Sequence, residues 1–259
     1  MTIQGKSCTL TAARDGYYYP LPYSEETVRL ASKGYALPGV IGERNREKRV
    51  ITGKTIQGCF VTMLEYQIVL PLFLLLFCPD ERFDLLADRV ASKLIYKNLG
   101  TKSFELRAEN KKSFYLKLDV NNNDDSYVTD WNITTPSMKW EPSRIYTYDG
   151  HKVIADRVTL PLVYAFELTG SFTEKSKFQI TLHFPLSKEH FPTQKKIEKL
   201  TIQIDAEDGI SLDIYDLEPV ADMTDINCAD TVLCFQKYNI TGVVVLNIHN
   251  QNTKTTVVL

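Results

Sequence analysis

Hydrophobic residues between positions 80 and 99 recur every three or four positions, which is the spacing of one face of an α-helix. The apolar members of this face are Phe83, Leu86, Ala87, Val90, Leu94 and Ile95. Asp80 is placed to cap the N-terminus of such a helix, and Gly100 stands where the helix would end. The pattern predicts one amphipathic helix over about 80–99. The apolar run at 68–78 is shorter than the roughly 20 residues of a membrane span, so we expect it in the core.

Downstream of residue 100 the alternation changes to period two, which is the pattern of a β-strand with one buried face. The clearest alternating segments are 104–107, 114–119, 177–184, 200–205 and 210–217. Turn-forming residues at 109–112 and 206–209 separate neighbouring segments, so we expect adjacent strands to run antiparallel. The expected fold is mainly β (α+β): an antiparallel β-sandwich or partly open barrel, with the 80–99 helix on one face.

The first 49 residues differ from the rest because they carry little periodic hydrophobicity. They contain an aromatic and proline-rich cluster at 17–23 and end in a basic segment, whose basic residues are Arg44, Arg46, Lys48 and Arg49. These features are typical of an extended arm that becomes ordered on another surface. We therefore divide the chain into an extended basic and aromatic arm, 1–49, and a single β-rich domain, 50–259.

The composition is that of an ordinary globular protein, with 44% hydrophobic and 24% charged residues. A net charge of −2 gives no global reason to expect nucleic acid or an anionic lipid surface as the main partner. The five cysteines are scattered and form no Cys-x-x-Cys pair, which argues against a zinc site and a disulfide framework. The N-terminus lacks the apolar core of a signal peptide. We expect a protein of the cytoplasm or of a virion, with no membrane span and no cofactor.

The segment from Asp205 to Asp230 contains nine acidic residues and no lysine or arginine. A solvated acidic face is the simpler interpretation. The alternative is electrostatic complementarity, in which the basic arm docks on this acidic edge within one chain or on a second copy. The candidate acidic residues for this contact are Asp205, Glu207, Asp208, Asp213 and Asp216.

Tyr19, Pro20, Pro22 and Tyr23 form a second candidate interaction site. The segment Pro20-Leu-Pro-Tyr23 resembles the short proline-tyrosine motifs with which matrix proteins of enveloped negative-strand RNA viruses, rhabdoviruses among them, recruit host budding factors. Their usual form is Pro-Pro-x-Tyr, and Leu21 stands here at the second proline. The resemblance covers this short segment alone and implies a host proline-recognition domain as a partner. The alternative is an arm that packs its tyrosines on its own domain.

A spacing similar to that of an EF-hand calcium loop begins at Asp119. Asp119, Asn121, Asn123 and Asp130 occupy positions 1, 3, 5 and 12 of such a loop. Position 6 is Asp124 instead of glycine, position 12 is aspartate instead of glutamate, and the flanking segments are predicted strands. An exposed loop is the simpler interpretation, and these four residues are weak candidates for metal ligands.

The patterns favour a non-enzymatic structural or assembly protein that self-associates through arm and edge contacts, as a virion matrix or capsid component would. One alternative is an intracellular adaptor whose arm is a peptide ligand for proline-recognition domains. The other is a metal-dependent enzyme that uses the 119–130 loop. The first hypothesis predicts homo-oligomers that depend on protein concentration, and the third predicts stabilisation by calcium or manganese.

Overall fold

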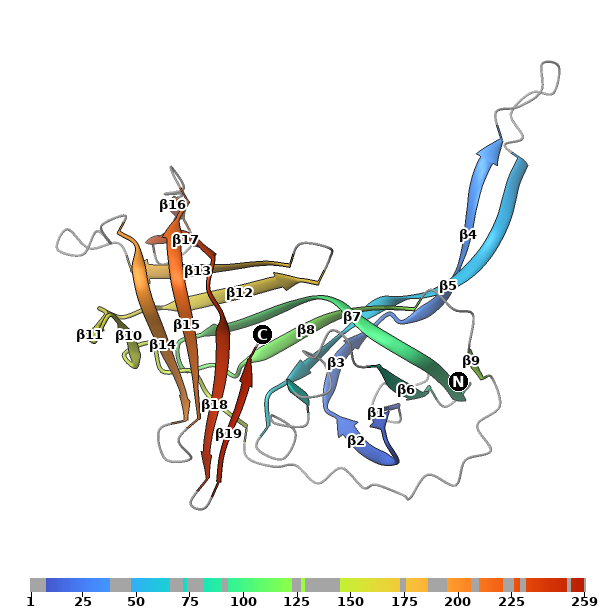
Figure 1. Ribbon diagram of the computed structural model, residues 1–259, viewed down its shortest axis with the longest axis horizontal. Helices are drawn as coiled ribbons and strands as arrows, with labels where there is room; N and C mark the ends of the chain where they lie inside the picture. Colours follow the sequence, from blue (N-terminus) through green and yellow to red (C-terminus); the bar gives the residue numbers. More distant parts are fainter. Residues whose placement is uncertain are drawn as a thin grey trace.

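The chain folds almost entirely into antiparallel β-structure in the computed structural model (Figure 1). The structure describes residues 8–37, 48–65, 72–73, 82–89, 93–122, 127–128, 145–172, 176–185, 195–205, 210–220, 226–228, 232–250 and 253–258. In these segments the sheet does not close into a barrel, and only Leu72 and Phe73 are helical. The prediction of a mainly β, sandwich-like fold is confirmed.

A small sheet is built around β6. Its strands, in spatial order, are β2 (Tyr17–Leu21), β1 (Thr9–Arg14), β6 (Phe83–Asp88), the first half of β7 (Lys93–Glu109) and β9 (Tyr127–Val128). Leu85, Leu86 and Ala87 of β6 are buried one after another. Because successive side chains of a strand point to opposite faces, β6 is covered on both of its faces.

The second half of β7 belongs to a larger sheet. Its central strands, in spatial order, are β5 (Lys48–Met63), β8 (Tyr115–Asn122), β7, β12 (Ala165–Ser171), β13 (Lys177–Pro185) and β17 (Val232–Ile240). Three further strands pair with its outer members: β3 (Tyr23–Glu26) and β4 (Arg29–Leu37) with β5, and β16 (Ile226–Cys228) with β17. Alternate residues of β8 and β12 are buried, so one face of the central sheet lies on the core.

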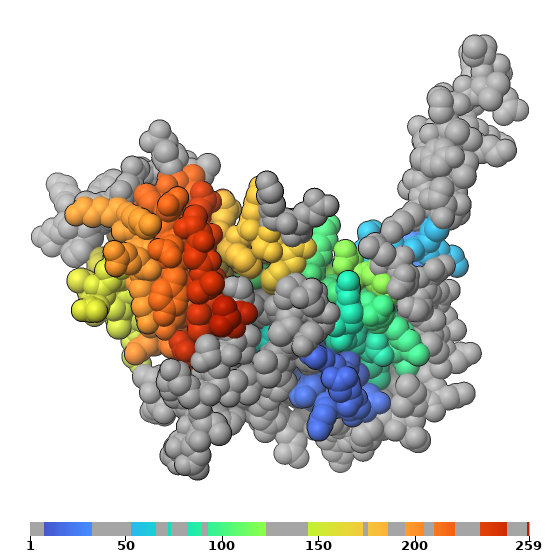
Figure 2. All heavy atoms as spheres, viewed as in Figure 1, coloured from blue at the N-terminus to red at the C-terminus, as the bar shows by residue number. Residues whose placement is uncertain are grey.

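The remaining strands form a second layer at one end of the molecule. They are β10 (Val153–Ala155), β11 (Val158–Thr159), β14 (Ile197–Asp205), β15 (Ile210–Pro219), β18 (Val244–Asn250) and β19 (Thr253–Val258). β15 joins the two layers, because its first half lies between β14 and β18 and its last residues pair with β17. Figure 1 shows β14, β15 and β18 crossing the direction of β12 and β13. Figure 2 shows these strands in orange and red at the left of the view, with β1 and β2 in blue near the lower centre.

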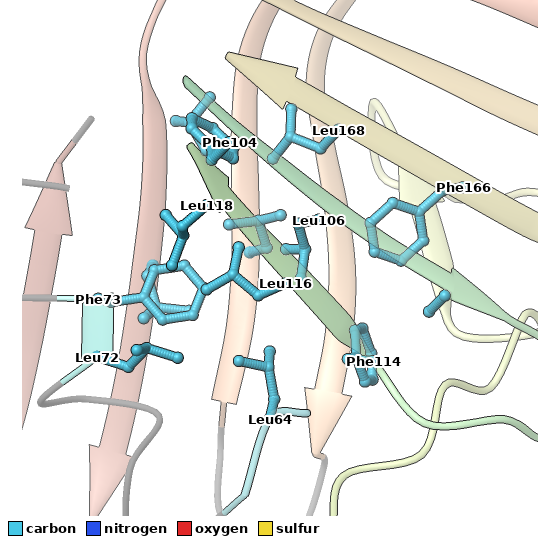
Figure 3. Packing of buried hydrophobic residues seen from close by; sticks show 14 of the residues in the cluster. Leu64, Leu72, Phe73, Phe104, Leu106, Phe114, Leu116, Leu118, Phe166 and Leu168 are labelled. Carbon is cyan, nitrogen blue, oxygen red and sulfur yellow. The ribbon is translucent and has the colours of Figure 1, made fainter. Parts of the chain in front are cut away.

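A hydrophobic core lies against the inner face of the central sheet. Figure 3 shows Leu106, Leu116 and Leu118 of β7 and β8 pointing toward Leu72 and Phe73. The apolar run at 68–78 was expected in the core, and its described residues, Leu72 and Phe73, are each only 1% exposed. The run therefore supplies side chains that fill the interior next to β8.

The predicted helix over 80–99 is wrong, because its described residues form β6 and the start of β7. A strand that is buried on both faces loses the period-two signal, so its apolar run imitates helical spacing. The left-handed backbone of Asn98 (φ 56°) also interrupts the alternation, and its N–H donates to Asp84 Oδ1 at 2.9 Å. Asp80 and Val90, which the helix prediction also used, lie outside the described residues.

Residues 9–37 belong to the sheet and core rather than to a separate arm. They form β1 to β4, and β5 begins at Lys48 and runs across the predicted boundary at residue 49. Their buried apolar side chains are Leu10, Ala12, Leu21 and Val28. The segment 17–26 carries a weak sequence signal because β2 and β3 are short and Leu21 is their only buried residue. Residues 1–7 and 38–47 of the predicted arm lie outside the described residues.

The connection from β3 to β4 crosses β5 at Gly58. Thr27 N–H donates to the carbonyl oxygen of Cys59 at 2.9 Å, and Cys59 N–H donates to Thr27 Oγ1 at 3.0 Å. A Cβ atom at Gly58 would lie 2.6 Å from both Thr27 O and Val28 Cα, and its φ is +151°. The close approach of two backbones therefore requires glycine here.

The predicted turn at 109–112 is confirmed. β7 ends at Glu109, β8 begins at Tyr115, and the two strands pair antiparallel. Lys111 takes the left-handed conformation (φ 63°) that reverses the chain. The strands on either side of 206–209 also pair, since Asp205 lies opposite Ile210.

Candidate functional site

The β4–β5 hairpin extends away from the rest of the molecule (Figure 1). Residues 56–63 of β5 lie in the sheet beside β8, whereas residues 48–55 pair with β4 alone. The part of β5 from 48 to 55 spans roughly 26 Å, because a strand rises about 3.3 Å per residue. Among the described strands, none pairs with the outer edge of β4 or with the other edge of β5 over 48–55.

The basic residues predicted from the sequence belong to this hairpin. Lys48 and Arg49 are the first residues of β5 and lie opposite Leu37 and Ala36, at the far end of the ribbon. Arg44 and Arg46 fall in the segment that connects β4 to β5, outside the described residues. The described part of the basic cluster, Lys48 and Arg49, therefore lies at the far end of the hairpin.

An ion pair that the sequence did not predict joins Glu26, at the end of β3, to Arg89, which directly follows β6 of the small sheet. Arg89 donates from Nε to Glu26 Oε2 at 2.9 Å and from Nη2 to Glu26 Oε1 at 2.7 Å. Arg89 Nη2 also donates to the carbonyl oxygen of Val28 at 2.7 Å and lies 3.1 Å from the hydroxyl of Tyr96. Burial disfavours the charged guanidinium, but the hydrogen bonds and charge of Glu26 outweigh it and raise the pKa of Arg89.

This ion pair joins residues 63 positions apart, so no local motif could have predicted it. The Glu26 side chain is only 8% exposed, and that of Arg89 is 33% exposed. The two parallel hydrogen bonds fix the orientation as well as the distance of the two groups. The contact holds the chain in place directly before β4, where the projecting hairpin begins.

The proline-tyrosine segment lies in strands. Tyr19 and Pro20 belong to β2, and Pro22 separates β2 from β3, which begins at Tyr23. β2 pairs with β1 alone among the described strands, and such an edge position accommodates proline. Tyr19 and Tyr23 pack against the core, and burial is the main reason that the pKa of Tyr23 is raised. Binding of this segment in the groove of another domain would require it to leave the sheet.

Asp213, at the centre of the acidic segment, is enclosed by partners from its own sheet. Its carboxylate accepts hydrogen bonds from Thr201 Oγ1 at 2.7 Å and from Asn247 Nδ2 at 2.9 Å, and it forms an ion pair with Lys199 Nζ at 2.9 Å. Lys199 Nζ also lies 5.4 Å from the centre of the Tyr215 ring. The hydrogen bond to Asp213 is the main cause of the raised pKa of Lys199. This network links β14, β15 and β18 and leaves Asp213 little freedom to bind a partner.

The other candidate acidic residues differ in their environments. Asp216 has a left-handed backbone (φ 54°), its side chain is 54% exposed, and its Oδ1 lies 3.9 Å from Lys196 Nζ. Asp205 ends β14. Glu207 and Asp208 lie outside the described residues. Asp216, unlike Asp213, is therefore an exposed carboxylate that a basic partner can reach.

The residues with calcium-loop spacing that the structure describes lie in a strand and not in a loop. Asp119 and Asn121 lie within β8, which is hydrogen-bonded to β5 and β7 on its two edges. Ser103 Oγ donates to Asp119 Oδ2 at 2.6 Å. An extended strand cannot curl around an ion as an EF-hand loop does. Asn123 and Asp130 lie outside the described residues, and within the described segments no three His, Cys, Asp or Glu side chains gather as metal ligands.

No protein-family model and no curated protein matches the sequence. In the part of the chain that the structure describes, no helix is long and apolar enough to cross a membrane. The geometry of the described residues is therefore the basis for a functional proposal. Its most distinctive feature is the projecting two-stranded hairpin with two open edges.

Proposed function

We propose that this chain is a non-enzymatic structural protein that assembles with copies of itself, and that the β4–β5 hairpin is its main assembly element. The observation that carries the proposal is the ribbon formed by β4 and residues 48–55 of β5, which has no further strand partner among the described residues. A virion matrix or capsid component is the kind of protein that this arrangement fits. Such a protein would act in the cytoplasm or in the virion.

An isolated two-stranded ribbon is marginally stable in water, because it buries little apolar surface. Its open edges also present unpaired N–H and C=O groups that another strand can satisfy. Pairing with a strand from a second copy would remedy both deficits. Among the described strands, β19 has an edge available for such pairing, since it pairs with β18 alone, and its Val258 is 59% exposed.

The charges of the chain support association between copies. In the sequence, Arg44, Arg46, Lys48 and Arg49 stand close together at the start of β5 and directly before it, while the segment 205–230 contains nine acidic residues and no lysine or arginine. Opposite patches of this kind raise the association rate and fix the orientation of the partners. We expect the assembly to weaken as salt increases, because the Debye length falls from about 10 Å at 0.1 M to about 3 Å at 1 M.

The test is the mass of the particle in solution, measured by sedimentation velocity and light scattering over a wide range of protein concentration. The full chain should form oligomers whose mass rises with concentration. A variant in which Lys33 is joined to Gly53 through Asn-Gly lacks the outer hairpin but keeps the paired residues at its base. It should remain monomeric. A full chain that is monomeric throughout contradicts the assembly function, and unchanged oligomers in the shortened variant contradict the role of the hairpin.

Charge reversal gives a second test that keeps the whole hairpin. Arg44→Glu combined with Arg46→Glu should weaken assembly, since both residues belong to the basic cluster. The matched control reverses Lys112 and Lys152, which are 61% and 45% exposed on the body and give the same change in net charge. Equal effects of the two double variants would mean that only net charge matters. Deleting residues 1–50 is a poor test, because it removes buried core residues such as Leu10 and Leu21.

A further inference from the structure

The solvent-facing side of the central sheet contains a groove with a volume of about 390 Å³. It lies over four adjacent strands in the order β8, β7, β12 and β13. The volume falls within the range of about 300–1,000 Å³ that is usual for small-molecule sites. None of the groove residues belongs to β4 or β5, and β8 pairs with β5 only over 56–63, so this site is separate from the outer part of the hairpin.

The strand register places the groove side chains in two parallel rows. One row contains Asp119, Ser103, Ser171 and Lys177, which lie opposite one another on successive strands. The second row contains Lys117, Glu105, Thr169 and Gln179 in the same strand order. The two central strands therefore provide a floor that is mostly small and hydroxyl-bearing, and the two outer strands provide longer charged or amide side chains as walls.

The aromatic side chain in this region packs on the other face of the sheet. Phe104 is 4% exposed and belongs to the core, where its ring centre lies 5.9 Å from that of Phe172 and 6.1 Å from that of Phe178. Gly170 lies between Phe104 and Phe178 in the register, and a Cβ atom there would come within 2.2 Å of the Phe104 ring. The groove is therefore lined mainly by polar side chains, and Phe104 and Gly170 complete its lining.

Several groove side chains are held in position by neighbours. Ser103 Oγ donates to Asp119 Oδ2 at 2.6 Å, and Gln179 Nε2 donates to Asn239 Oδ1 at 2.7 Å. The second bond leaves the carbonyl oxygen of Gln179 as an acceptor. Lys117 and Lys177 form no ion pair or hydrogen bond in the described part of the chain, so their ammonium groups are available as donors.

The chemistry of this lining points to one class of ligand. Two carboxylates, Glu105 and Asp119, balance two ammonium groups, Lys117 and Lys177, so the groove does not favour a strongly charged ligand of either sign. A polar lining also does not suit a lipid chain. Closely spaced donors and acceptors match the hydroxyl groups of a sugar, because each hydroxyl can both donate and accept. We propose that the groove binds a short segment of a neutral carbohydrate.

The full chain should be titrated with maltotriose, cellotriose, chitotriose and lactose, by ligand-observed NMR and calorimetry. Concentrations up to about 10 mM will detect affinities in the millimolar range. We expect at least one of these sugars to bind and inorganic phosphate not to bind. Failure of all four sugars to bind overturns the proposal. Phosphate binding that competes with the sugar would assign the lysines to an anion site and would also overturn it.

Two variants locate the binding. Thr169→Tyr places a large side chain on the floor of the groove, and Gln179→Ala removes one wall acceptor. Each should weaken sugar binding by about tenfold or more, the effect expected for a lost polar contact in a built site. Thr159→Tyr on β11 is the matched control, because Thr159 is exposed and outside the groove. Thermal unfolding will confirm that the variants fold, and unchanged affinity in both groove variants contradicts the assignment.

Discussion

Replacing Arg89 by alanine is expected to destabilise the fold far more than loss of an ordinary surface ion pair. The variant leaves the carboxylate of Glu26 without its bidentate partner in a site where its side chain is 8% exposed. Removing one partner of a buried ion pair typically costs about 3–5 kcal/mol. The Arg89 side chain is 33% exposed, so water can reach part of the site, and we expect the lower end, about 3 kcal/mol.

The free energy of unfolding can be measured by urea denaturation with far-ultraviolet circular dichroism. For a chain of this size, 1 kcal/mol corresponds to roughly 2–4 °C in Tm, so Tm should fall by about 6–12 °C. A double-mutant cycle with Glu26→Gln isolates the pair. Arg89→Ala leaves the negative charge of Glu26 unpaired, and Glu26→Gln removes that charge. The loss of unfolding free energy in the double variant should therefore be about 2 kcal/mol smaller than the sum of the losses in the single variants.

The control is Lys93→Ala on the neighbouring part of the small sheet. Lys93 Nζ lies 2.9 Å from Asp88 Oδ2, which is as close as the Arg89 contact, but the Lys93 side chain is 57% exposed. Exposed pairs contribute about 0.2–1 kcal/mol, so this variant should change little. If Arg89→Ala costs no more than Lys93→Ala, or if the double-mutant cycle is additive, the ion pair does not hold the N-terminal strands in place.

Three further predictions address other parts of the fold. Gly58→Ala should destabilise the fold by at least about 2 kcal/mol, because its Cβ would overlap the backbone of Thr27 and Val28 and its φ would be strained. Gly53→Ala is the control and should not destabilise the fold, because a Cβ there meets open space. Equal urea midpoints for the two variants would contradict the close approach at Gly58. Asp213→Ala should cost about 2–3 kcal/mol because its buried hydrogen-bond partners lose their acceptor. By the same measurement Asp216→Asn should be nearly neutral, because asparagine also tolerates the left-handed backbone at this exposed position. Burial lowers the pKa of His183 in the folded protein. The stability that depends on its neutral form is therefore fully present above the unfolded-state pKa of about 6.5. It is lost as the pH falls from that value toward the folded-state pKa. Between about pH 7.5 and pH 5, wild type should therefore lose stability relative to His183→Asn, and a constant difference would show that His183 is not the titrating group.

The regions that could be predicted from the sequence are those with one buried and one solvent-facing side. β8 and β13 alternate along their lengths, and the reversal at Glu109–Lys112 carries residues suited to a turn. These signals are local, because alternation depends only on which side of each strand faces the core. They predicted antiparallel strands and a sandwich-like fold without any knowledge of the partners.

The candidate sites were predicted less well because their environment is set by distant residues. Asp213 was expected on an interaction surface, but donors from β14 and β18 enclose it. Asp119 was expected in a loop, but it lies on a paired strand and accepts a hydrogen bond from Ser103. A carboxylate has the same appearance in the sequence whether it is solvated or buried among donors. Only the strand register decides between these cases.

The sequence by itself determined that the chain forms a β-rich fold, and it placed the turns and the charged segments. The tertiary structure decided that 83–88 and 93–99 form strands and that residues 9–37 join the sheet. It also decided that the β4–β5 hairpin projects, with edges that no other described strand covers. The physical reason is that strands gain their stability from partners remote in the chain. A buried central strand such as β6 and an edge strand such as β4 differ in what lies beside them, and local periodicity does not contain that information.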